Sequence, residues 1–224
     1  MGKCISPNEK EIEQLRTPLT EGEKKVLDIF KEKTSDEWEI YVQPHLNGSR
    51  PDFILLNPKI GIGVFEVKDW KIETLSFQNK ILNINGKSRT SPNTIIDNYK
   101  KNICTLYCPR LNTRYGLAVI TTGLIFPNIS ESELEKYQIK RNLYSKEPFS
   151  RYKTLSGNET VTDSNIKKIY PDHNRENSLT MKKEYVQDLK NWFLEPEYSK
   201  EQRDTIILDK NQQEIVNSRT ETGY

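Results

Sequence analysis

The sequence predicts an α/β domain, because helix-like and strand-like segments follow one another through its first 127 residues. A capped amphipathic helix comes first, and three short strand-like segments follow it. A second helix and a late apolar strand complete the pattern. Beyond residue 127 the chain is more polar, and we expect a mostly helical or irregular C-terminal extension there.

The first helix is predicted from its N-terminal signal. Thr20 suits the N-cap position, and Glu23 lies three residues later, which is the spacing of a capping box. Residues 1–17, which precede it, are charged and expected to be irregular. The apolar residues after the cap form one stripe at helical spacing, namely Val26, Leu27 and Phe30.

Three strands are predicted next, at residues 38–42, 52–56 and 60–68. The turn Asn57-Pro58-Lys59 joins the second to the third, which makes them antiparallel neighbours. The third strand is almost continuously apolar until two charges appear at its end. Such a pattern is typical of a strand that is covered on both faces.

A polar hairpin extension is expected after the third strand, with segments 72–77 and 80–84 and a second turn at Asn85-Gly86. The remaining elements are predicted from periodicity and from proline and glycine signals. They are helices at 94–108, 131–137 and 181–194 and a strand at 116–126.

Composition excludes several classes of protein. The formal charge is +2, so any electrostatic footprint must be local. An odd count of three cysteines without a CxxC pair argues against a disulfide framework and for a reducing compartment. The chain has no apolar run long enough to span a membrane and no signal-peptide core, so we expect a cytoplasmic protein.

Two acidic residues and a lysine are notable because they lie at the ends of apolar strands. Glu66 and Lys68 are two residues apart, so on a strand both side chains lie on one face. Asp52 opens the second strand, and a turn centred near residue 59 places it opposite Glu66. The sequence therefore predicts that these two carboxylates are cross-strand neighbours, with Cβ atoms about 4.5–5.5 Å apart.

Two like charges at that separation repel each other, and a divalent cation would remove the repulsion. Hard oxygen ligands suit Mg²⁺ or Mn²⁺. The alternative is an acidic pair at a strand end with Lys68 as its salt-bridge partner, and the spacing alone leaves both open. Three other acid-x-Lys triplets, which begin at Glu23, Asp69 and Asp188, lie in polar or amphipathic surroundings typical of a solvated face.

The motif Pro51-Asp52…Glu66-Val67-Lys68 resembles the metal-dependent nuclease motif of the restriction-endonuclease-like PD-(D/E)xK superfamily. Over residues 19–127 the wider pattern is similar to the nuclease-related domain (NERD) family. In that family Asn is usual where this chain has Asp69, and a glutamine is common near Ile95 and Asp97. The matching parts are Gly22-Glu23, Pro51-Asp52-Phe53, the segment 61–70, Ser91-Pro92, Tyr99-Lys100 and the late apolar strand.

This resemblance implies a central mixed sheet flanked by helices, and an enzyme that hydrolyses the phosphodiester bonds of DNA. Asp52, Glu66 and the backbone carbonyl of Val67 would hold Mg²⁺ or Mn²⁺. Lys68 would orient the attacking water or neutralise charge on the phosphate. Glu23 would be an outer or second-metal ligand, although its place in a capping box explains it equally well.

Contacts to nucleic acid are expected from local basic patches. Residues 136–153 hold six basic residues and one acid, with aromatic rings between them that suit base stacking. The alternative is a solvated insertion whose rings pack on the domain. A weaker patch covers residues 98–114. The expected contacts are Lys136, Lys140, Arg141, Lys146, Arg151, Lys153, Lys100 and Lys101.

Residues 208–216 resemble the segment that precedes the phosphate-binding loop of superfamily-one helicases, in which Gln212 would recognise adenine. The chain contains no GxxxxGK[ST] motif. We therefore expect the N-terminal part of a nuclease–helicase protein; the alternative is that this tail is an ordinary polar helix. Bacterial proteins of that build are tied to DNA processing or defence against phage, which is an analogy.

Four parts are thus expected along the chain: a tail (1–18), a nuclease core (19–127), a basic and aromatic insertion with a C-terminal helix (128–197), and a linker that begins a helicase-like module (198–224). Two other functions stay open. One is a catalytically inactive nucleic-acid-binding or docking domain with a nuclease fold. The other is a scaffold that binds proteins through Trp192 and Phe193.

Overall fold

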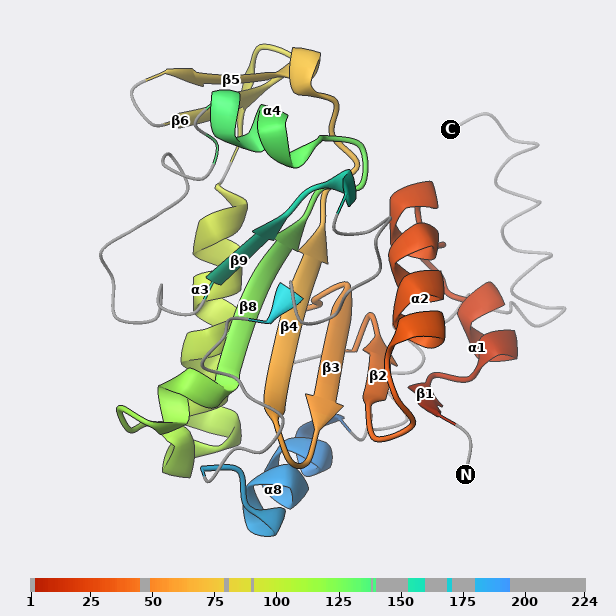
Figure 1. Ribbon diagram of the computed structural model, residues 1–224, viewed down its shortest axis with the longest axis vertical. Coiled ribbons are helices and arrows are strands. Elements are labelled where there is room, and N and C mark those ends of the chain that lie inside the picture. Colours follow the sequence, from red (N-terminus) through yellow and green to blue (C-terminus); the bar gives the residue numbers. More distant parts are fainter. Residues whose placement is uncertain are drawn as a thin grey trace, which may run out of the picture.

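The computed structural model describes residues 3–44, 49–78, 81–89, 91–137, 139, 153–159, 169–170 and 180–193. Its centre is a six-stranded sheet in the order β1-β2-β3-β4-β8-β9 (Figure 1). β2, β3 and β4 pair antiparallel, whereas β1, β8 and β9 join in parallel, so the sheet is mixed as predicted. The strands are β1 (Cys4–Ser6), β2 (Glu39–Val42), β3 (Phe53–Asn57), β4 (Gly61–Val67), β8 (Ile120–Ile125) and β9 (Lys153–Ser156).

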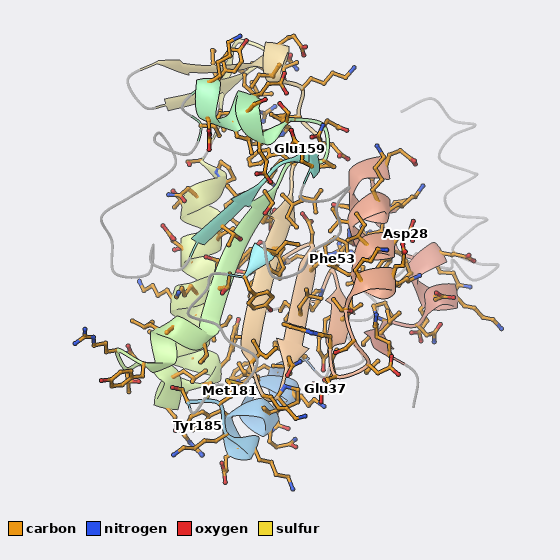
Figure 2. The ribbon with its side chains drawn as sticks, viewed as in Figure 1. Asp28, Glu37, Phe53, Glu159, Met181 and Tyr185 are labelled. Carbon is orange, nitrogen blue, oxygen red and sulfur yellow. The ribbon has the colours of Figure 1, made fainter. Side chains whose placement is uncertain are left out.

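Helices cover both faces of this sheet. On one face lies α2 (Glu21–Lys33), whose predicted capping box between Thr20 and Glu23 is confirmed. Its Phe30 ring lies 5.5 Å from the ring of Phe53, and Figure 2 shows Phe53 between β3 and α2. The other face is covered by α3 (Pro92–Asn102), the π-helical turn η2 (Ile103–Tyr107) and α8 (Lys183–Phe193).

Strand alternation decides which helix each residue of β4 meets. Phe65 and Val67 belong to the apolar cluster on the α2 side, whereas Ile62 and Val64 belong to the cluster on the α3 side. Even-numbered residues of β4 therefore face α3. This rule places Glu66 on the α3 side of the sheet.

A three-stranded small sheet, β5-β6-β7, follows β4 and lies at the end of the main sheet where β4 ends (Figure 1). Its second turn is the predicted Asn85-Gly86, and both residues have the positive φ that such a turn requires, 52° and 74°. The remaining elements are short. They are α1 (Glu9–Glu13), η1 (Ile72–Thr74), β5 (Leu75–Gln78), β6 (Ile81–Ile84), β7 (Lys87–Arg89), η3 (Pro109–Leu111), η4 (Gly116–Val119) and α4 (Glu131–Lys136).

Several expectations from sequence are wrong. The strand predicted from residue 116 begins only at Ile120, because residues 116–119 form the 3-10 helix η4. The N-terminal segment is not irregular, because β1 pairs with β2 and α1 has a capping box at Asn8. β9 is a strand within a region that was expected to hold only short helices. Phe193 is buried against Tyr41 at a ring distance of 4.8 Å, so this ring is not available to a protein partner.

Two expectations from composition can be compared with the described part of the chain. Cys104 and Cys108 are buried and all three cysteines are free. Among the described residues no helix combines the length and the apolar character that a membrane span needs. The predicted contacts Lys140, Arg141, Lys146 and Arg151, the helicase-like segment with Gln212 and the whole part 198–224 lie outside the described residues.

Candidate active site

The hairpin of β3 and β4 brings Asp52 beside Glu66. Phe53 is paired with Phe65 and Asn57 with Gly61, so the register places the residue before Phe53 opposite Glu66. The predicted cross-strand relation is therefore confirmed. Asp52 Oδ2 also accepts a hydrogen bond of 2.7 Å from the backbone N–H of Val67. In an extended residue the N–H and C=O lie on the same side of the strand, so the Val67 carbonyl also faces the Asp52 side.

The Glu66 carboxylate holds two partners, one on each oxygen. Lys68 Nζ lies 2.6 Å from Oε2, and the Tyr99 hydroxyl donates to Oε1 at 2.5 Å. The Glu66 side chain is 7% exposed and that of Lys68 20% exposed. The lysine can therefore be reached from solvent, whereas the carboxylate is held in place from the sheet and from α3.

The pKa of Asp52 is shifted by burial and by several neighbouring charges. Burial, the Glu66 carboxylate and then the Glu23 carboxylate raise the pKa of Asp52 well above its ordinary value, and Lys68 and the Val67 N–H oppose this only in part. Burial and the charge of Glu66 also raise the pKa of Tyr99, so its phenol keeps its proton and serves as a donor. The site thus holds more negative charge than its own lysine neutralises.

The N-terminus of α2 is fastened to the residue after Lys68. Asp69 Oδ2 accepts a hydrogen bond of 3.1 Å from the Gly22 N–H, while the buried Oδ1 atom has no partner. A Cβ atom on Gly22 would lie 1.6 Å from Asp69 Oδ1, so only glycine fits there. Glu23, the next residue, bonds the Thr20 N–H at 2.8 Å. The capping role of Glu23 is therefore present, and its charge still acts on Asp52.

The oxygen atoms at this end of the sheet bear on whether a divalent cation can bind there. Within the described residues, no group of three or more His, Cys, Asp and Glu side chains is arranged to hold a metal ion. The candidate oxygen donors are the carboxylates of Asp52 and Glu66, which the register places opposite each other, and the Val67 carbonyl on the Asp52 side of β4. Burial and then the Glu66 and Glu23 carboxylates raise the pKa of Asp52, which a cation would oppose, and carboxylate oxygens retain lone pairs beyond those already used. Oxygen donors of this kind are the ones that Mg²⁺ or Mn²⁺ prefers.

Comparison with known families bears on the same segment. A family model described as the nuclease-related domain matches residues 19–121. This segment is therefore similar to nuclease-related domains. The match begins just before α2 and ends within β8, so it includes Asp52, Glu66, Lys68 and Tyr99. Neither a curated protein nor a solved structure matches the chain.

One of the predicted nucleic-acid contacts, Lys100, is wrong. It is fully buried, and its Nζ donates to the Ile120 carbonyl at 2.6 Å, so it cannot contact a phosphate. Helical spacing explains this, because Lys100 follows Ile96 by four residues on the apolar stripe. Lys101 is exposed, and Lys136 lies over the Tyr137 ring, so both stay predictions. The side chain of Lys153 is outside the described residues.

Sequence reasoning included Tyr99 in the family resemblance but gave it no role in the site. Its role depends on a contact between α3 and β4, which are distant in the sequence. A signal did exist, because Ile96, Tyr99 and Ile103 recur at helical spacing and place a phenol on the buried face of the helix. A buried phenol needs an acceptor, and Glu66 is the acceptor in this fold.

We predict that Gly22→Ala destabilises the protein. Alanine in a helix is ordinarily favoured over glycine by about 1 kcal/mol, but here its Cβ would overlap the Asp69 carboxylate and approach Pro127 Cγ at 2.6 Å. Overpacking of this kind costs about 1–3 kcal/mol, which urea unfolding would measure. Asp69→Ala in the same chain removes one of the two clashes, so the double variant should recover part of the loss. An increase in stability on Gly22→Ala would contradict the close approach.

We also predict that Tyr99→Phe lowers the free energy of unfolding by about 1.5–3 kcal/mol, because it removes a hydrogen bond to a charged group. The matched control is Tyr107→Phe in the following turn. The Tyr107 hydroxyl is buried without a hydrogen-bond partner, so its removal should be neutral or stabilising. Equal losses in the two variants would show that the Tyr99–Glu66 contact adds nothing specific.

Proposed function

We propose that this protein is a divalent-metal-dependent nuclease that hydrolyses the phosphodiester bonds of DNA. The observation that supports this most is the meeting of Asp52, Glu66 and Lys68 at the end of β4, within a segment similar to nuclease-related domains. Two acidic ligands and a reachable lysine are the groups that phosphodiester hydrolysis needs.

In this proposal Asp52, Glu66 and the Val67 carbonyl hold Mg²⁺ or Mn²⁺. The bound ion would polarise the scissile phosphate and lower the pKa of an attacking water. Lys68 stabilises the negative charge that develops on the phosphate, or orients the water, from its position 2.6 Å from Glu66. Tyr99 fixes the rotamer of Glu66 through its hydrogen bond, and Asp69 fixes the backbone that follows Lys68.

The proposal extends to a longer polypeptide. The helicase-like segment at 208–216 suggests that the nuclease works beside a helicase module in a bacterial protein for DNA processing or defence against phage. This part rests on sequence resemblance alone. The residues that would contact nucleic acid in the insertion, such as Arg141 and Lys146, belong to the same proposal.

A catalytically inactive nucleic-acid-binding domain is the second candidate. It is favoured by the closed hydrogen bonding of Glu66, whose two oxygens are both engaged by side chains of the same chain. In that case Lys68 would serve as the ion-pair partner of Glu66. The two candidates differ in one respect, which is whether cleavage accompanies binding.

Cleavage of a plasmid in the presence of Mg²⁺ or Mn²⁺ separates them. We expect Asp52→Ala and Lys68→Ala each to reduce the rate by about 10²–10³-fold, as loss of a ligand or of a charge-stabilising donor does. Lys25→Ala, an exposed lysine of α2 in another acid-x-Lys triplet, is the matched control and should cleave like the wild type. Cleavage that neither Asp52→Ala nor Lys68→Ala alters would reject the proposed site.

Stability provides a readout that does not depend on activity. Because the folded-state pKa of Asp52 is raised, ionised Asp52 disfavours folding, and wild-type stability should increase as pH falls from the raised pKa toward about 3.9. Asp52→Asn removes this dependence and keeps an acceptor for the Val67 N–H. In EDTA at pH 7 we therefore expect Asp52→Asn to be more stable than the wild type.

Adding Mg²⁺ should reverse the order. A cation that binds only the folded wild type raises its unfolding free energy with concentration, whereas the variant lacks one ligand. Urea unfolding with and without MgCl₂ measures both effects. Equal stabilisation of the two proteins by Mg²⁺ would show that the ion does not bind at Asp52.

A further inference from the structure

The open edge of the small sheet carries a basic strand near the candidate active site. β7 is the outer strand of the order β5-β6-β7, and its three residues, Lys87, Ser88 and Arg89, are all exposed. Within the described residues no acidic side chain pairs with Lys87 or Arg89. Two cations without an acidic partner in the described part of the chain therefore lie on one short strand.

The register determines where these cations point. Lys87 is paired with Ile84 and Arg89 with Leu82, so all four side chains lie on one face of the small sheet. Leu82 on that face is 2% exposed, which identifies it as the face toward the body of the domain. The side chains of Lys87 and Arg89 therefore lie on the same face as Leu82, the face toward the domain. They are exposed because they lie beyond the part of that face that the domain covers.

The small sheet is fixed to the site end of the main sheet. Trp70, two residues after Lys68, packs on Phe126 with ring centroids 5.9 Å apart, and Ile72 and Leu75 pack on the core cluster of the α3 side. At its other end, β7 leads directly into α3, which delivers Tyr99 to Glu66. Both connections of the small sheet therefore run to the candidate site.

Chain geometry limits the separation. Pro92 to Tyr99 spans about 10 Å along α3 at 1.5 Å per residue, and Arg89 to Pro92 spans at most about 10 Å of extended chain. Arg89 thus lies within about 20 Å of the residue that binds Glu66. On a duplex this corresponds to about six base pairs at 3.4 Å each. A DNA strand bound at the candidate site can therefore reach β7 within about half a turn of the double helix.

The charged residues around the small sheet indicate over which element DNA approaches the site. Lys71, three residues after Lys68, is exposed and adds a cation between the site and the small sheet, where Glu73 is the only described acid of the segment 71–89. At the same end of the molecule (Figure 1), α4 carries three acids, Glu131, Glu133 and Glu135, and one cation, Lys136, so its net charge is negative. The charges therefore favour approach over β7, and Lys136 at the C-terminal end of α4 stays a predicted contact.

We propose that β7 is a backbone-contact strand for duplex DNA, in which Lys87 and Arg89 bind phosphates within about half a turn of the phosphodiester at Asp52 and Glu66. This inference rests on the proposed function and adds the surface on which the substrate lies. The contact is independent of base sequence, because phosphate contacts position a duplex without reading it.

The test is equilibrium binding of a fluorescent 20-base-pair duplex in EDTA, where no cleavage occurs, over a range of KCl concentrations. For Lys87→Gln/Arg89→Gln we expect binding on the order of tenfold weaker and a slope of log K against log salt smaller in magnitude by about 1.8, since each lost phosphate contact removes about 0.9. The control is Lys182→Gln/Lys183→Gln. Both residues are exposed, and they are sequence neighbours of Met181 and Tyr185, which Figure 2 labels at the end of the molecule opposite the small sheet.

The outcomes separate this inference from the nuclease proposal. A slope that stays at the wild-type value in Lys87→Gln/Arg89→Gln, or that falls equally in the control, overturns the role of β7 even if Mg²⁺-dependent cleavage is observed. A slope that falls only in the β7 variant supports the role of β7, even if no metal ion supports cleavage and the nuclease proposal fails. Circular dichroism of each variant confirms that the fold is retained.

Discussion

The hydrogen bond from the Val67 N–H to Asp52 fixes the geometry on which the rest of the site depends. It closes the β3–β4 hairpin at the end where the ladder stops and holds a carboxylate next to Glu66. The bond stabilises the charged form of Asp52, but burial and two neighbouring carboxylates act more strongly in the opposite sense. The neutral form of Asp52 is therefore favoured in the folded protein when no cation is bound.

The structure around these carboxylates comes from both faces of the sheet. α3 fixes Glu66 through Tyr99, and α2 meets the chain at Asp69 through the only kind of residue that fits there, Gly22. Lys68 lies between these two fixed points and keeps the freedom of a partly exposed side chain. Rigid acids beside a more accessible ammonium group suit a site that has to hold an ion and admit a phosphate.

Local signals in the sequence were sufficient for the capping box at Thr20, for the Asn85-Gly86 turn and for the opposition of Asp52 and Glu66. They were insufficient wherever a partner is distant in sequence. β1 and β9 are strands of only three and four residues, and each exists because it pairs with a neighbour more than 25 residues away. For Lys100 a local signal gave the wrong answer. Its positive charge predicted an exposed contact to nucleic acid, but its position on the apolar face of α3 buries it.

The main sheet extends beyond the nuclease-related segment at both margins. β1 precedes residue 19 and β9 follows residue 121, and they are the two outermost strands. Lys3 also bonds the carbonyls of Phe30 and Thr34 at the C-terminal end of α2. A fragment trimmed to residues 19–121 would lose β1, β9 and most of β8, and would leave the backbone groups of β2 and β4 open to pairing between molecules. Self-association of such a fragment would therefore reflect missing edge strands and not the behaviour of the intact chain.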